Sequence, residues 1–244
     1  MKILLLSALM LPTLFAQGRG GPPPAAKVAA PFDPTGYWVS EIVDEWRFRV
    51  TPQKGDIPYM PINAEARRIA NAWDPDKDAS SGNACKAYGA IGVMQRPVRL
   101  HITWADDNTL KMDLDAGGQT RLFKFGPAAQ APAGEPSWQG NSTAQWQVVQ
   151  QRGAVAQGPR GGTLKVVTTN LKPGYLRKNG VPYSDRAVQT EYINYVVGQQ
   201  KDEYLVDTSM VDDPVYLTGP FIRTYTFKKE SDGSKWDPSP CWNR

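Results

Sequence analysis

Histidine and cysteine are scarce in this chain of 244 residues, which holds one His and two Cys. Zinc and copper sites use two or more ligands of these types, so the composition argues against a transition-metal centre. A catalytic thiol at Cys85 is disfavoured as well, because His101 would have to serve as its base. We therefore expect no metal and no cofactor.

The chain also has no strong excess of one charge and no basic cluster. It carries 28 Lys and Arg against 24 Asp and Glu, and the densest basic groups are the pairs Arg67-Arg68 and Lys228-Lys229. Nucleic-acid binding calls for basic residues gathered with aromatics on one face. We expect no nucleic-acid partner.

Long hydrophobic runs are missing except at the start of the sequence. Lys2, the apolar stretch Ile3 to Leu11, Pro12 and the small Ala16 form the layout of a secretory signal peptide, with cleavage expected after Ala16. The stretch is shorter than the ~20 residues that span a bilayer, which disfavours a transmembrane anchor. Residues 1–16 are therefore predicted to be removed, leaving a periplasmic or secreted chain without a membrane span.

An oxidising compartment favours a disulfide between the two cysteines, Cys85 and Cys241. Closing a ring of this size contributes up to about 5 kcal/mol by loop entropy. The bond would fasten the C-terminal tail to the first third of the fold.

Glycine and proline are frequent, at 22 and 21 residues, and they shape the predicted organisation. Residues 17–31 are rich in both and cannot bury an apolar face, so we predict a disordered leader followed by one domain over 32–244. A helix is expected over Ala64 to Ala72, with Asn63 as its N-cap and Pro75 as its stop.

Apolar and polar residues alternate through most of the rest of the chain, which is the signature of strands. Val98 to Trp104, Leu110 to Leu114 and Thr120 to Phe125 read as three successive antiparallel strands. Further strands are expected over 37–50, 137–150, 163–169, 186–197, 203–211 and 221–229. The pattern predicts an all-β fold: a single antiparallel β-barrel with one short helix and long loops.

Gly36-Tyr37-Trp38, at the entry to the first predicted strand, resembles the G-x-W signature of lipocalins and other calycins. In that family the tryptophan closes one end of the barrel beneath a basic side chain from the final strand. The resemblance implies a lipocalin-like barrel in which Arg223 covers Trp38, a contact worth ~0.5 to 2 kcal/mol.

A wider resemblance covers most of the mature chain. Leu164 to Asn170, Gly174 to Ser184, Thr190 to Tyr192 and Asp213 to Phe221 are similar to segments of a group of exported, β-rich bacterial proteins known as hypothetical proteins. This likeness implies export and β architecture and carries no catalytic residue.

Carboxylates are the candidate acids and bases of a histidine-poor enzyme. Glu191 lies within a predicted strand, and Asp213 follows Asp212 and precedes Pro214, where a turn with Asp213 accepting backbone amides is the alternative. Tyr183 and Arg177 lie in a polar, aromatic segment that could form a pocket rim. The candidate catalytic residues are Glu191, Asp213, Tyr183 and Arg177.

Aromatic residues make up 10% of the chain and recur on strand faces, where they either fill a core or line a cup for an apolar ligand. The predicted ligand-binding residues are Trp46, Trp104, Trp146, Tyr175, Arg177, Tyr183 and Tyr192. Three functions follow: binding of a small hydrophobic or aromatic molecule, a cofactor-free lyase, isomerase or hydrolase in the same barrel, or a structural envelope module.

Overall fold

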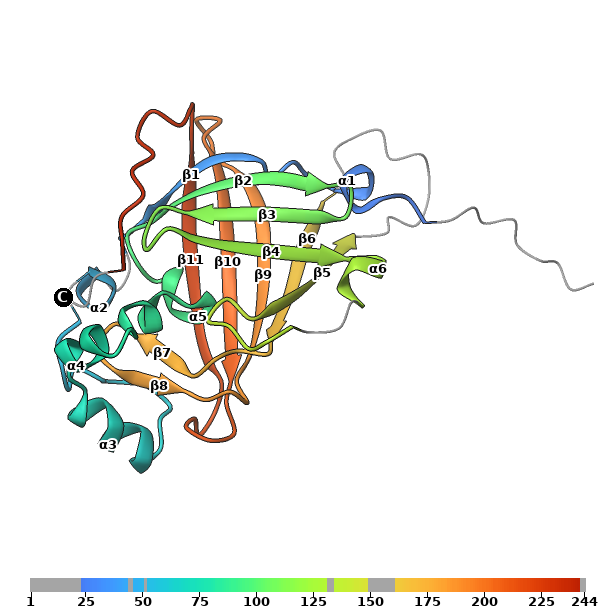
Figure 1. Cartoon of the computed structure of the whole chain (residues 1–244). Helices are drawn as coiled ribbons and strands as arrows, with labels where there is room; N and C mark the ends of the chain where they lie inside the picture. The colour runs from blue at the N-terminus through green and yellow to red at the C-terminus, as the bar shows by residue number, and fades with distance from the viewer. Residues whose placement is uncertain (1–22, 44–45, 51, 131–133, 149–160, 242–244) are drawn as a thin grey trace, which may run out of the picture.

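Nine strands close into a barrel (Figure 1) in the computed structural model, which describes residues 23–43, 46–50, 52–130, 134–148 and 161–241. The strand order around the barrel is β1-β11-β10-β9-β6-β5-β4-β3-β2. These strands are β1 (Gly36–Glu41), β2 (Arg99–Asp106), β3 (Thr109–Leu114), β4 (Gln119–Phe125), β5 (Asn141–Val148), β6 (Gly162–Thr169), β9 (Val188–Val197), β10 (Glu203–Asp212) and β11 (Phe221–Glu230). The all-β barrel predicted from the alternation is confirmed.

One strand pair departs from the predicted antiparallel pattern. Strands β4 and β5 are parallel, with Phe123 opposite Ser142 and Phe125 opposite Ala144. The Pro- and Gly-rich connection over 126–140, which begins with helix α6 (Gly126–Ala129), is a crossover long enough to return the chain in the same direction. The barrel is therefore mixed, and the expectation of a purely antiparallel sheet is wrong at this junction.

Alternate positions on each strand fill the barrel. Leu100 and Ile102 on β2 and Leu110, Met112 and Leu114 on β3 are almost fully buried, while the residues between them are partly exposed. This period of two places one face of each strand inside and the other in solvent. Most interior positions carry apolar side chains that belong to one core cluster.

Short helices are more numerous than the one that the sequence predicted. They are α1 (Ala26–Ala29), α2 (Trp46–Val50), α3 (Ala64–Ala72), α4 (Pro75–Ser80), the 3₁₀ helix η1 (Ala84–Tyr88), α5 (Ala90–Val93) and α6. The capping prediction for α3 is confirmed, since Asn63 Oδ1 accepts a hydrogen bond from Ala66 N at 2.9 Å. Pro75 starts the next helix instead of only ending this one.

Helix α2 replaces the second half of the long strand predicted over 37–50. Its Arg49 is buried, and the guanidinium donates from Nε to Gln95 O and from Nη1 to Glu41 O, each at 3.0 Å. A buried guanidinium needs such acceptors, and the helical turn delivers them. Tertiary contacts thus decide the conformation where the apolar alternation alone indicated a strand.

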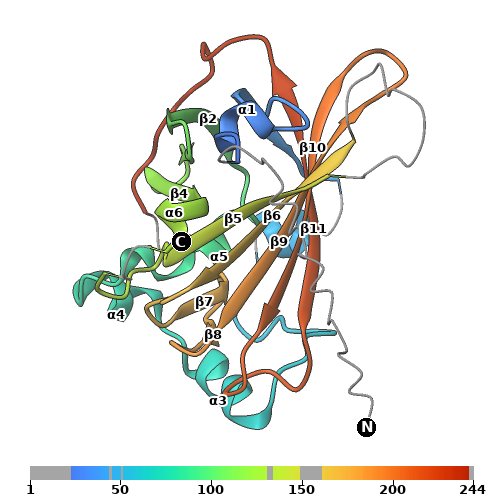
Figure 2. The same cartoon turned by 90° about the vertical axis from the view of Figure 1, so that its right-hand side faces the viewer.

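A second, two-stranded sheet lies beside the barrel (Figure 2). Its strands β7 (Gly174–Arg177) and β8 (Val181–Tyr183) pack with α3 and α5 around a separate apolar cluster that includes Ala66, Ile91 and Leu176. Helices α1 and α3 lie at opposite ends of the molecule (Figures 1 and 2). The barrel therefore has an α1 end and an end that faces the second sheet.

The predicted disulfide is confirmed. Cys85 in η1 and Cys241 beyond β11 are bonded at 2.00 Å across 156 positions of sequence. None of the described helices has the length and hydrophobicity needed to cross a membrane. The predicted signal peptide lies outside the described residues, and part of the predicted disordered leader forms α1, whose Ala26 is buried.

Candidate functional site

Trp38 on β1 belongs to the apolar core of the barrel. Gly36 has a φ of +117°, a backbone conformation that favours glycine, and it leads into β1. The Trp38 side chain is fully buried, its indole Nε1 donates to Pro34 O at 3.0 Å, and Lys229 Nζ lies 5.3 Å from the ring centroid. Trp38 is thus buried beneath a basic side chain of the last strand, and that side chain is Lys229.

Arg223 is therefore not the partner of Trp38, and that expectation is corrected. Trp38 pairs in register with Lys229, six positions further along β11 than Arg223. Six residues of strand span roughly 20 Å, so Arg223 lies far from the indole. Its guanidinium is 4.5 Å from the centroid of the Phe221 ring.

Two residues of the predicted ligand cup do not face the interior. Trp46 belongs to α2 and is 61% exposed, so it lines no cup. Tyr192 occupies an outward position on β9, beneath the Nζ of Lys165 at 5.7 Å. Tyr192 directly follows Glu191, whose side chain points into the barrel. Neighbouring strand residues point to opposite faces, so the side chain of Tyr192 points outward.

The other two tryptophans, Trp104 and Trp146, do lie at the α1 end and pack in a row of rings. Phe125 is 5.8 Å from Trp104 and 5.5 Å from Trp146, and Phe32 meets Trp146 edge-on at 5.3 Å. The indole Nε1 of Trp146 donates to Ala26 O at 2.8 Å. This end of the barrel is filled largely by its own aromatic side chains.

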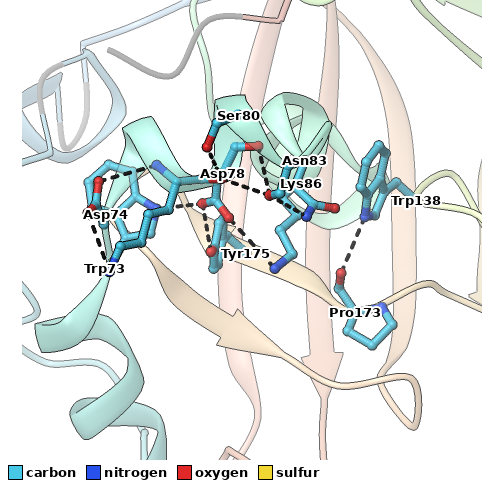
Figure 3. A network of polar contacts seen from close by, with 11 residues as sticks. Trp73, Asp74, Asp78, Ser80, Asn83, Lys86, Trp138, Pro173 and Tyr175 are labelled. Carbon is cyan, nitrogen blue, oxygen red and sulfur yellow. Dashed lines mark hydrogen bonds and ion pairs between the residues drawn. The ribbon is translucent and has the colours of Figure 1, made fainter.

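Tyr175, Arg177 and Tyr183 belong to the second sheet and are buried, so they do not form an open rim. Figure 3 shows the polar network around Asp78, whose Oδ2 accepts from Tyr175 Oη at 2.8 Å and from Trp73 Nε1 at 3.0 Å. Burial, followed by the bond to Asp78, raises the pKa of Tyr175. The network joins α4 to β7.

Asp213 is a turn residue. Its Oδ2 accepts from Ser184 N at 2.7 Å, and its Oδ1 accepts from Ser184 Oγ at 2.7 Å and from Val215 N at 2.9 Å. These bonds match the turn alternative and use both carboxylate oxygens. The structure gives Asp213 a structural role in joining the segment after β8 to the segment after β10.

Glu191 points into the middle of the barrel from β9 and is fully buried. Arg121 on β4 reaches across the interior and donates from Nη1 to Oε1 at 2.7 Å and from Nη2 to Oε2 at 2.5 Å. This two-pronged geometry is the strongest form of a carboxylate–guanidinium bond. Burial alone would lower the pKa of Arg121, but the charge of Glu191 and these bonds raise it.

A second buried carboxyl, Asp207 on β10, lies next to Glu191. Glu191 is opposite Ser209 and Asp207 is opposite Ile193, which makes the two acids diagonal neighbours on the same face. No N–H or O–H group of the described chain donates to either Asp207 oxygen. Burial raises the pKa of Asp207 well above its usual range, the charge of Glu191 raises it further, and Arg121 offsets only part of the increase.

The two carboxyls differ in their neighbours. Each oxygen of Glu191 accepts an N–H bond from Arg121, whereas neither oxygen of Asp207 has a hydrogen-bond partner within the described chain. Burial first, and then the charge of Glu191, raise the pKa of Asp207, so this acid holds its proton to higher pH than an exposed aspartic acid does.

Polar groups around the acids complete what we call the acid centre: Arg121, Thr168, Gln189, Glu191 and Asp207. Arg121 Nη2 reaches Thr168 Oγ1 at 3.4 Å, and Gln189 Nε2 donates to Ser209 Oγ at 3.0 Å. The Nε of Arg121 and the Oε1 of Gln189 are buried without a hydrogen-bond partner in the described chain. Unpaired buried polar atoms are costly, which marks the centre as built for more than packing.

Tyr225 lines the acid centre from the neighbouring strand. It faces Asp207 across the β10–β11 ladder and is buried, and the Cζ of Arg49 from α2 lies 5.5 Å from its ring. Burial and then Asp207 raise the pKa of this phenol, against the charges of Arg223, Arg49 and Arg177. A buried phenol and a buried carboxyl, both with a raised pKa, thus lie side by side.

No family model, curated protein or solved structure matches the chain.

Function is therefore inferred from the acid centre. Of its residues, only Glu191 was identified from the sequence. Arg121 and Asp207 were missed, although each occupies an inward position between apolar neighbours, Phe123 for Arg121 and Leu205 for Asp207. A charge at an inward position of a strand was the available signal. The described chain contains no group of three or more His, Cys, Asp or Glu that could hold a metal.

Proposed function

We propose that this chain is an exported, lipocalin-like barrel that performs proton-transfer chemistry on a small molecule at the acid centre, without a cofactor. The observation that carries the proposal is the buried Asp207, with no hydrogen-bond partner in the described chain, next to Glu191, which Arg121 holds in place. A buried carboxyl whose surroundings raise its proton affinity is a usual mark of acid–base catalysis. A location in the periplasm or outside the cell is part of the proposal, and the Cys85–Cys241 disulfide supports it.

Asp207 would be the catalytic residue. Its carboxylic acid donates a proton to a substrate oxygen, and the carboxylate that results takes a proton from a carbon or oxygen of the same molecule, which restores the acid. Arg121 offsets the extra negative charge while both acids are ionised, and Glu191 keeps the proton affinity of Asp207 high. The corresponding reactions are isomerisation and the elimination or addition of water.

The burial of the centre restricts the substrate. Arg121 and Glu191 form an ion pair there, and the charges of Arg49, Arg177 and Arg223 act on the neighbouring Tyr225. A charged substrate group would lose its hydration on entering so buried a site. The unpaired Nε of Arg121 suits a substrate oxygen acceptor, and the unpaired Oε1 of Gln189 suits a donor.

The test starts with the purified mature protein incubated with a small-molecule extract of its host, followed by mass spectrometry of altered compounds. Asp207→Asn should reduce turnover by about 10² to 10⁴-fold, the usual range for loss of a general acid. Asp212→Asn is the matched control, because Asp212 is an exposed carboxylate on the same strand. Unchanged turnover in Asp207→Asn overturns the proposal.

Glu191 acts through Asp207, so its test needs a pH profile. Removing its negative charge leaves the Arg121 charge beside Asp207, which lowers the pKa of that acid. We expect Glu191→Gln to move the alkaline limit of activity to lower pH. A profile of unchanged shape with a lower maximum would indicate a structural role only.

A protein that neither alters nor retains any compound fits the envelope-module alternative.

Binding of a small hydrophobic or aromatic molecule, the first expectation from the sequence, has a different candidate location. The groove at the α1 end has aromatic walls and an open volume, and its chemistry is separate from that of the acid centre.

A further inference from the structure

Helix α1 lies across the tip of the β2–β3 hairpin and forms one wall of a groove. Lys27 N donates to Asp107 O at 3.0 Å, and Ala26 N donates to Asn108 Oδ1 at 2.9 Å. Trp146 Nε1 anchors the other side of the helix through Ala26 O. These bonds fix the backbone of α1 against the barrel, so the wall is preformed.

The groove has the dimensions of a small-molecule site. Its volume is about 610 Å³, and its lining includes Lys27, Phe32, Asp33, Thr103 and Trp104. Small-molecule sites occupy roughly 300 to 1,000 Å³ and combine aromatic walls with a few polar groups. The groove has both.

Phe32 and Trp104 supply rigid aromatic walls. Phe32 is stacked on Tyr195 at 5.7 Å and contacts Trp146, while Trp104 leans on Phe125. Rings held from behind in this way cannot collapse into the groove. A planar aromatic ligand would gain about 0.5 to 1.5 kcal/mol from each ring contact beyond the area buried.

Within the described chain, the indole N–H groups of Trp104 and of Trp236, which packs on Tyr37 and His101, have no acceptor, unlike those of four other tryptophans. Trp38, Trp73, Trp138 and Trp146 each donate to a carbonyl or carboxylate oxygen. Trp104 has no acceptor within the described chain, and its ring lines the groove. A donor left open beside a cavity suits a ligand with an acceptor oxygen.

The groove lining holds one charge of each sign, Lys27 and Asp33. Asp33 is occupied by its own turn, accepting from Thr35 N at 3.0 Å and from Thr35 Oγ1 at 2.7 Å. Lys27 has no ion-pair partner among the residues that the structure describes. The ammonium of Lys27 and the Trp104 N–H are therefore two donors of the lining that have no protein partner in the described chain and can meet a ligand.

We propose that this groove binds a small aromatic carboxylate, with its ring against Trp104 and Phe32 and its carboxylate toward Lys27 and the indole N–H. The site is separate from the acid centre. An aromatic acid bound here would not need to be the substrate of the buried carboxyls.

The test uses 2-naphthoate, with the neutral amide 2-naphthamide and the cation 2-naphthylmethylammonium as matched probes, in isothermal titration calorimetry. We expect 2-naphthoate to bind most tightly. Lys27→Gln should weaken it about two- to fivefold, the range of an exposed charge pair, and bring its affinity close to that of the amide. Lys165→Gln, on the outer face of β6, should leave the affinity unchanged.

A spectroscopic readout covers the case in which a groove variant folds poorly. The indole N–H signal of Trp104 in a ¹⁵N–¹H spectrum, assigned by its loss in Trp104→Phe, should shift on addition of 2-naphthoate. An unmoved Trp104 signal, or equal affinity for the amide or the cation, would overturn the proposal. Asp207→Asn should keep full 2-naphthoate binding, so failure of the acid–base proposal and failure of this one are distinguishable.

Discussion

Replacing Asp207 by Asn should change how the free energy of unfolding depends on pH. The folded-state pKa of Asp207 is raised well above its ordinary value, chiefly by burial and then by Glu191. The native protein therefore keeps a proton that the unfolded chain loses above about pH 3.9, the ordinary pKa of Asp. The stability that this proton contributes is full below that pH and is lost as pH rises toward the folded-state pKa.

The magnitude follows from linkage. Within that window the native state binds one proton more than the unfolded state at this site, so the free energy of unfolding falls by about 1.4 kcal/mol per pH unit. Asn is a neutral group of the same shape, and its amide can donate to Glu191 in place of the acid. Asp207→Asn should remove this slope and gain stability relative to the wild type as pH rises.

Urea denaturation of both proteins at pH 5, 6 and 7 measures the effect, with the disulfide kept intact. The difference in unfolding free energy should grow with pH, by up to about 1.4 kcal/mol per pH unit while the pH lies between the unfolded-state and folded-state pKa of Asp207. Asp212→Asn, an exposed site on the same strand, should follow the wild type. Parallel pH curves for Asp207→Asn and the wild type would refute a protonated Asp207.

Three further substitutions test other features. Arg121→Met should cost about 3 to 5 kcal/mol in urea denaturation, because Glu191 would be left charged and unpaired, whereas the double variant Arg121→Met with Glu191→Leu should recover most of that loss. Cys85→Ser should lower the free energy of unfolding by up to about 5 kcal/mol, and a loss below 1 kcal/mol would contradict a large entropic constraint. Gly180→Ala should cost roughly 2 kcal/mol or more by thermal unfolding, since Gly180 has a φ of +82° and its added Cβ would lie 2.2 Å from that of Trp73.

Features that depend on local pattern were predictable from the sequence. The alternation around Leu100 and Ile102 identified β2 and its buried face, because apolar and polar residues that alternate with a period of two can be recognised among sequence neighbours. The Asn63 cap was predictable for the same reason. The disulfide followed from composition, since two cysteines allow one pairing.

Features that depend on how the barrel closes were not predictable from the sequence. Arg121 on β4 and Glu191 on β9 are separated in the sheet by β5 and β6, and they meet only across the interior. The parallel junction of β4 and β5 also depends on the path of a long connection. Arg49 shows the same limit, since its buried bonds to Gln95 and Glu41 hold α2 where the pattern indicated a strand.

The position of Cys241 after β11 has a consequence for the order of maturation. Its thiol enters the growing polypeptide only after every barrel strand has been synthesised. Since Cys85 is the sole other thiol, oxidation has a single intramolecular product and needs no reshuffling. No covalent tie can therefore restrict the strands during synthesis, and the sulfur–sulfur link constrains the chain only once Cys241 has been made.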